Sequence, residues 1–140
     1  MIQITTYPRL RWELETYTPA PIDHTGWTAI STISQLQAIN TNSTTLAGSY
    51  YLVNDIDATE TSGWNAGAGF IPLGYANAGG TRFQGKFDGN GFSIINLYVN
   101  RSVTYTGLFG LAYTNAQINN VRLVNPSISG TTAVGGVIGA

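Results

Sequence analysis

The 140-residue chain contains no cysteine. Thiol catalysis, thiolate metal sites and disulfide bonds are therefore excluded, and the redox compartment stays open. Charge is also scarce, because Asp, Glu, Lys and Arg make up only 9% of the residues, against about 25% in an average soluble domain. The formal net charge of −1 gives no electrostatic surface for nucleic acid or for an anionic membrane. Nucleic-acid binding is therefore not expected.

Signals for export and for membrane insertion are missing as well. The opening residues MIQITTYPRLRWELE lack the cationic and apolar regions of a Sec signal peptide. No apolar run approaches the ~18 residues needed to span a bilayer. We therefore expect neither a Sec leader at Met1 nor membrane insertion.

Apolar residues are plentiful, at 43% of the chain, and the length suits one ordinary domain with its own core. Asn, Thr, Ser and Gly supply the polarity that charged residues usually supply. Such a hydrated but nearly uncharged surface favours stacked β-structure, in which like side chains form ladders along the stack.

Residues 1–26 differ from the rest and are predicted to form an anchor strand followed by a Pro-rich linker. In RLRWELE, apolar and charged residues alternate with a period of two, which is typical of a strand with one apolar face. An isolated strand is unstable in water. We expect it either to form an edge strand of the main domain or to dock on a partner chain. The predicted anchoring residues are Leu10, Trp12 and Leu14.

A short helix is predicted from about Thr32 to Ile39. Apolar residues recur there at intervals of three, and Thr32 and Gln35 have the spacing of a capping box. Asn40, Thr41 and Asn42 are expected to end this helix, and no other helix is expected. From about residue 50 onward, short apolar runs are separated by Gly and Asn.

Those apolar runs repeat. The segment from Ile94 to Val99 and the segment from Ile118 to Leu123 share the form Ile-x-Asn-apolar-x-apolar, 24 residues apart. A period in the twenties indicates a solenoid. Within each repeat, Leu97 and Val99, or their counterparts, should point inward, and a bend after the leading Ile would let it point inward too. The predicted fold is therefore an all-β, right-handed parallel β-helix, in which Asn96 and Asn120 stack with their amides bonded.

The order of these motifs resembles the GLUG-repeat family of β-helical adhesin and fibre modules, over about residues 27–140. The resemblance is carried by YYLVNDID, FIPLG, FQGKFDGNGFSIINL, GLFG and GVIG, preceded by ISTISQLQAIN. It implies a β-helix and roles in adhesion or as a spacer on long extracellular proteins. It implies no catalytic residues. Residues 1–26 have no counterpart in it.

Two sets of small and polar residues are predicted to shape the turns. The dipeptides Asp-Gly and Asn-Gly within FDGNG favour a tight turn or corner, since Gly adopts positive φ freely and Asn tolerates it. A calcium loop would need more acids there, and a phosphate cradle would need a helix to follow. The predicted structural turn residues are Asp88, Gly89, Asn90, Gly91, Gly107, Gly110, Gly136 and Gly139.

Candidate chemistry is sparse. Asp55 and Asp57 lie two residues apart and form a weak calcium candidate, although solvated acids are the simpler interpretation. His24, the only histidine, is interpreted as an exposed, idle side chain of the linker. A polysaccharide-cleaving site needs paired acids, and no acid follows Asp88. We therefore expect no catalytic residues and no cofactor.

Four tyrosines give the repeats aromatic surface that could stack on sugars or form ladders within the fold. They are Tyr75, Tyr98, Tyr105 and Tyr113.

Three functions are compatible with these features. The favoured hypothesis is a virion structural protein, a bacteriophage tail fibre or spike that is anchored through residues 1–26 and projects for host attachment. Its expected partners are other virion proteins, sister chains in a homotrimer and a host surface glycan. The alternative is a fragment of a bacterial cell-surface adhesin, and the third hypothesis is a polysaccharide-degrading enzyme. The unfinished repeat at GVIGA also predicts that the natural chain continues past Ala140.

Overall fold

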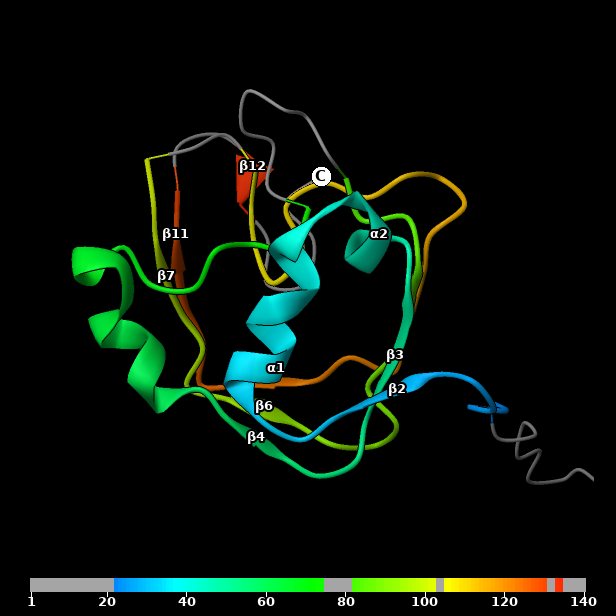
Figure 1. Cartoon of the computed structure of the whole chain (residues 1–140). Coiled ribbons are helices and arrows are strands. Elements are labelled where there is room, and N and C mark those ends of the chain that lie inside the picture. Colours follow the sequence, from blue (N-terminus) through cyan, green and yellow to red (C-terminus); the bar gives the residue numbers. More distant parts are fainter. Residues whose placement is uncertain (1–21, 75–81, 103–104, 131–132, 135–140) are drawn as a thin grey trace, which may run out of the picture.

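The computed structural model describes residues 22–74, 82–102, 105–130 and 133–134. Within them, short helices lie between very short strands (Figure 1). The anchoring residues Leu10, Trp12 and Leu14 predicted from the sequence lie outside this part of the chain, as do Gly136 and Gly139.

The helix predicted near residue 32 is present as α1 (Ile33–Ala38). Thr32 caps it, because its side chain accepts a hydrogen bond of 3.2 Å from the backbone N–H of Gln35. The return bond of a capping box is displaced by one residue, since Gln35 Oε1 accepts from the backbone N–H of Ser31 at 2.7 Å. Ile33 and Leu36 are buried. The capping pattern and the period of three thus predicted this helix correctly.

The expectation of a single helix is wrong. The residues that were expected to stop α1 continue it as a 3-10 helix, η2 (Ile39–Thr41). Asn42 then caps a further helix, α2 (Ser43–Leu46), through a reciprocal capping box with Thr45. After β4 (Ile56–Asp57), the segment η3 (Thr59–Gly67) consists of two short 3-10 helices separated by a kink, where Asn65 and Ala66 are left-handed. A one-turn helix buries too few side chains for its period to show in the sequence.

Among the described residues, the strands pair in parallel in four small sheets. The largest sheet has the order β2 (Thr28–Ile30), β3 (Ser49–Leu52), β5 (Lys86–Asp88) and β9 (Gln117–Asn119). The second sheet has the order β4 (Ile56–Asp57), β6 (Ile94–Ile95) and β10 (Leu123–Val124). The two-stranded sheets pair β7 (Tyr98–Asn100) with β11 (Ser127–Ser129) and β8 (Tyr105–Thr106) with β12 (Ala133–Val134).

The predicted fold class, an all-β right-handed parallel β-helix, is contradicted. The described residues form a mixed fold of short helices and small separate sheets, and no closed solenoid is seen in them. The repeat pattern identified the parallel strands but did not reveal the helical segments that interrupt them. In the chain, α1, η2 and α2 lie between β2 and β3, and η3 lies between β4 and β5.

The 24-residue register is also wrong. Ile94 pairs with Leu123, and Ile118 pairs with Phe87. Asn96 and Asn120 both have left-handed φ, at 62° and 56°, so both end an Ile-x-Asn segment at a corner, but they occupy different corners. The sequence match therefore aligned two segments that belong to different sheets and do not pair with each other. The predicted bend after Ile94 is confirmed at Asn96, and Ile94, Leu97 and Val99 are fully buried.

Three strand layers follow from this pairing. We call β3 and β4 the inner layer, β5, β6 and β7 the middle layer, and β9, β10 and β11 the outer layer. The core between them is aromatic, with Phe109 packed 4.9 Å from Phe83 and 5.6 Å from Phe87 between ring centroids. At the end of the stack beyond the inner layer, α1 lies over the space that the strands surround (Figure 1).

Candidate functional site

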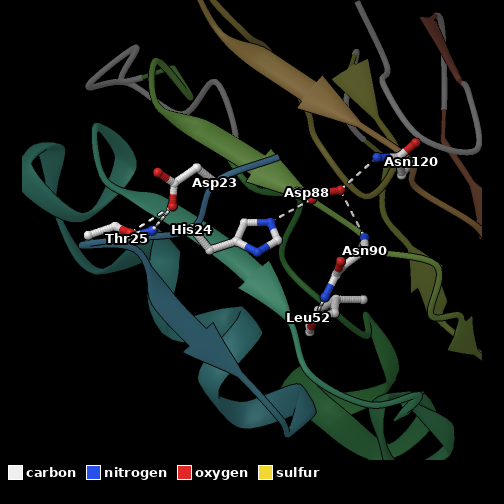
Figure 2. A network of polar contacts seen from close by, with 7 residues as sticks. All are labelled: Asp23, His24, Thr25, Leu52, Asp88, Asn90 and Asn120. Atoms are coloured by element: carbon white, nitrogen blue, oxygen red, sulfur yellow. Dashed lines mark hydrogen bonds and ion pairs between the residues drawn. The ribbon is translucent and has the colours of Figure 1, made fainter. Parts of the chain in front are cut away.

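The strongest polar constellation centres on Asp88, the last residue of β5. Its side chain is only 3% exposed. Asp88 Oδ1 accepts hydrogen bonds from the backbone N–H of Asn90 at 2.9 Å and from Nδ2 of Asn120 at 2.8 Å. Asn90 in turn donates to the carbonyl of Leu52 at 3.1 Å, so this cluster joins all three layers (Figure 2).

His24 supplies the remaining contact to Asp88. Its Nε2 lies 2.7 Å from Asp88 Oδ2. The imidazole stacks on Tyr51 at a centroid distance of 4.2 Å with an interplanar angle of 8°, and meets the edge of Trp27 at 5.0 Å. The expectation of an exposed, idle His24 is therefore wrong, because the half-buried ring pins the segment before β2 against β3 and β5.

Hydrogen bonding determines the ionisation of Asp88. Burial acts to raise the pKa of its carboxyl, but the donors Asn120, His24 and Asn90 outweigh it, and the net pKa lies below the usual value. A carboxylate with three donors is stabilised in its charged form. The carboxylate is thus held ionised.

A His–Asp pair can orient an imidazole as a general base, which requires a group for that base to activate. Among the described residues, no serine, threonine or tyrosine hydroxyl is hydrogen-bonded to His24. Within this part of the chain, the contacts of the His24–Asp88 pair are those of a structural clamp between segments.

The turn predicted at FDGNG is confirmed and has a further role. Asn90 and Gly91 have positive φ, at 55° and 82°. Gly89 is required for a different reason, because a Cβ there would lie 2.1 Å from the carbonyl oxygen of Asn120. The middle and outer layers therefore approach each other closely beside Asp88.

A second polar chain crosses the layers at another corner. Asn125 Nδ2 donates to Asn96 Oδ1 at 2.8 Å, and Asn96 Nδ2 donates to Thr59 Oγ1 at 2.9 Å. Thr59 Oγ1 then donates to Asp57 Oδ1 at 2.6 Å. The predicted asparagine stacking thus exists, but between Asn96 and Asn125.

Asp55 and Asp57, the weak calcium candidate, have two separate structural roles. Asp55 Oδ1 accepts from the backbone N–H of Ser93 at 2.9 Å. Asp57 is exposed, and the side-chain hydroxyl and backbone N–H of Thr59 lower the pKa of its carboxyl. In the described part of the chain, no three His, Cys, Asp or Glu residues are grouped as metal ligands. Both acids act as acceptors in turns and between layers.

The remaining predicted residues are placed as follows. Gly107 and Gly110 are buried, and the Gly110 N–H donates to the carbonyl of Leu73 at 2.7 Å. Tyr98 is half-buried, whereas Tyr113 is 44% exposed, with the Arg82 guanidinium 5.4 Å from its ring centroid. Tyr75 lies outside the described residues.

Sequence reasoning missed His24 and Asn120 as partners of Asp88. One signal was available, because Asp88 is the last acid in the chain and His24 the only histidine. Their 64-residue separation could not be bridged without the parallel pairing of β2, β3 and β5.

No helix in the described segments is both long and apolar enough to cross a bilayer.

Comparisons with known proteins give two relatives. The chain is 41% identical over 115 residues to halomucin of Haloquadratum walsbyi, an alignment that covers 79% of this chain and 1% of halomucin. It is 37% identical over 81 residues to a protein of Evansella cellulosilytica provisionally named a Gly-rich membrane protein, covering 57% of this chain and 9% of that protein. The chain thus spans a small fraction of either relative. No family model and no solved structure matches. These relatives agree with the cell-surface location given above as the alternative, and not with the virion.

Proposed function

We propose that the chain is a non-catalytic structural module of a cell-surface protein, which contributes a rigid unit of low charge to a surface layer or an adhesin. The observation that carries this proposal is the 41% identity to a segment of halomucin across 79% of the chain. The proposed role of this module is adhesion or spacing. It takes up the adhesin alternative in preference to the phage fibre.

The polar networks support a structural role. In both of them, side chains of one layer bond side chains or backbone of a neighbouring layer, through Asp88 at one corner and Asn96 at another. These groups are already engaged with the protein itself and so hold the layers in register. The low charge limits electrostatic attraction to charged partners.

Location on intact cells tests this proposal. Antibodies raised against the purified chain should label unbroken cells of the source organism, and external protease should remove the label. Phage particles purified on a density gradient are tested with the same antibodies for comparison. Label confined to phage particles or to broken cells would overturn the proposal and favour the virion hypothesis.

Lack of catalysis is tested separately. Purified protein is incubated with a panel of bacterial polysaccharides, and reducing ends and unsaturated sugars are measured. No turnover above that of heat-denatured protein is expected. Turnover that is lost in a His24→Ala variant with an intact fold would instead assign an enzyme.

A further inference from the structure

We propose that Asn42 is a glycosylation site, at which the side-chain amide nitrogen carries an N-linked oligosaccharide. The inference rests on the proposed function, because a glycan of this kind belongs to the surface of an exported protein. It deepens that function by naming a covalent modification of the module and the class of sugar donor that supplies it.

The first observation is an acceptor sequence. N-linked glycans are attached to Asn in the sequence Asn-X-Ser/Thr, where X is not Pro. The chain has this sequence at Asn42-Ser43-Thr44 and at Asn100-Arg101-Ser102. So short a motif arises easily in a chain rich in Asn, Ser and Thr. The structure must therefore distinguish an available acceptor from one that is already used by the fold.

The second observation is the state of the asparagine amide nitrogens. Most asparagine side chains in the described segments use Nδ2 as a donor that holds two parts of the fold together. These donors are Asn40, Asn54, Asn65, Asn90, Asn96, Asn120 and Asn125. In contrast, Asn42 Nδ2 donates no hydrogen bond to any described residue. A sugar attached to this nitrogen would break no internal contact.

The rest of the acceptor sequence is accessible as well. Asn42 Oδ1 accepts from the backbone N–H of Thr45 at 2.9 Å and so caps α2. Glycosylation replaces one hydrogen of Nδ2 and leaves Oδ1 unchanged, so this cap survives. Asn42, Ser43 and Thr44 are all exposed. The Thr44 hydroxyl makes no hydrogen bond within the described part of the chain, so a transferase can bind it.

The surroundings of Asn42 give the third observation. No Asp, Glu, Lys, Arg or His occurs from Thr25 to Asn54, although many side chains of this segment are exposed. Charged residues ordinarily keep a protein surface hydrated and prevent association. A bulky, hydrophilic glycan supplies that hydration where charge is missing.

Asn100 is the less suitable acceptor. It is the last residue of β7, its N–H donates to the carbonyl of Ala68 at 2.9 Å, and its Oδ1 accepts from Ser129 Oγ at 3.1 Å. Two neighbouring segments therefore hold this residue in place. Asn42 lies between η2 and α2, and among the described residues its side chain is hydrogen-bonded only to Thr45.

The proposed transfer needs one class of donor, an oligosaccharide linked to a membrane lipid through phosphate. Asn42 Nδ2 forms a bond to the anomeric carbon of the donor and loses one proton. The bond between that carbon and the phosphate oxygen breaks, and its electron pair leaves with the lipid phosphate. No oxidant or reductant takes part.

The test is peptide mass spectrometry of the chain, captured with the antibodies described above from total extracts of the source cells. The peptide that contains Asn42 should be heavier by a whole number of sugar residues, and its fragments should place the sugar on Asn42. Thr44→Val removes the hydroxyl and should abolish the glycan, whereas Thr44→Ser keeps the hydroxyl and should retain it. Ser43→Ala leaves the acceptor sequence intact and is the matched control.

An unmodified Asn42 in the wild-type chain would overturn the inference, as would a glycan on Asn100 alone or one on Asn42 that survives Thr44→Val. If Thr44→Val fails to fold, the wild-type peptide decides the case. Antibody labelling of intact cells is scored separately. Surface label with an unmodified Asn42 rejects this inference alone, and absence of surface label rejects the proposed function whatever Asn42 carries.

Discussion

At the scale of single residues, neighbouring glycines of the FDGNG turn have different physical requirements. Gly89 faces the carbonyl of Asn120 with no room for a Cβ, whereas Gly91 has φ of +82° and open space. Gly89→Ala forces two backbones apart and should destabilise the protein by about 2–4 kcal/mol. Gly91→Ala meets only left-handed strain, of about 1–2 kcal/mol. Urea unfolding of both variants measures the difference. Equal losses would show that layer contact at Gly89 is not the constraint.

Asp88 should give the stability a dependence on acid pH. Its pKa is lowered in the folded protein, so it contributes stability that is fully present above the unfolded value of about 3.9 and is lost as pH falls through the folded value. Asp88→Asn keeps the shape and removes the titrating group. The variant should therefore lose less free energy of unfolding than the wild type between about pH 5 and pH 2.

The exposed acid Glu60 supplies the control for that experiment. Glu60→Gln removes the same charge and should keep the wild-type pH dependence. If Glu60→Gln and Asp88→Asn have identical profiles, the Asp88 carboxylate is not the acid-sensitive group.

At the scale of elements, the corner asparagines combine two functions. Asn96 adopts φ of 62° and bonds both Thr59 and Asn125. Asn96→Gly relieves the backbone strain and removes only the side-chain bonds, so it should destabilise by about 1 kcal/mol. Asn96→Ala adds left-handed strain and should destabilise more. Thermal unfolding of the two variants separates these contributions, and a Gly variant less stable than the Ala variant would reverse the argument.

The elements also mark how far the sequence could be interpreted. α1 was predicted from local signals alone, the Thr32 cap and the apolar spacing, because both act within one turn. The corner at Asn90 was predicted for the same reason. Register and the His24 contact depended on pairing between distant segments. The middle and outer layers each have two left-handed asparagine corners. A shift by one side of a layer therefore looked like the true repeat in the sequence, as the Ile94 and Ile118 motifs show.

For the whole molecule, the low charge predicts that stability depends only weakly on salt concentration. Only 9% of the residues are charged. Added salt therefore has few ion pairs to screen and little charge repulsion to reduce. The melting temperature should change by only about 2 °C between about 0.05 M and 0.5 M NaCl. A rise of about 10 °C or more, measured by calorimetry, would indicate a fold that depends on screening or on specific ion binding.

The parallel pairing of the layers also determines how the molecule would respond to force. Pulling on the chain from the outer end would remove one layer at a time, because each layer is bonded chiefly to the layer beneath it. Ile94 and its partner Leu123 are 29 residues apart, so detaching a layer would release about 100 Å of extended chain. A surface protein containing such a module would lengthen in discrete steps under flow or shear and absorb mechanical work at each step.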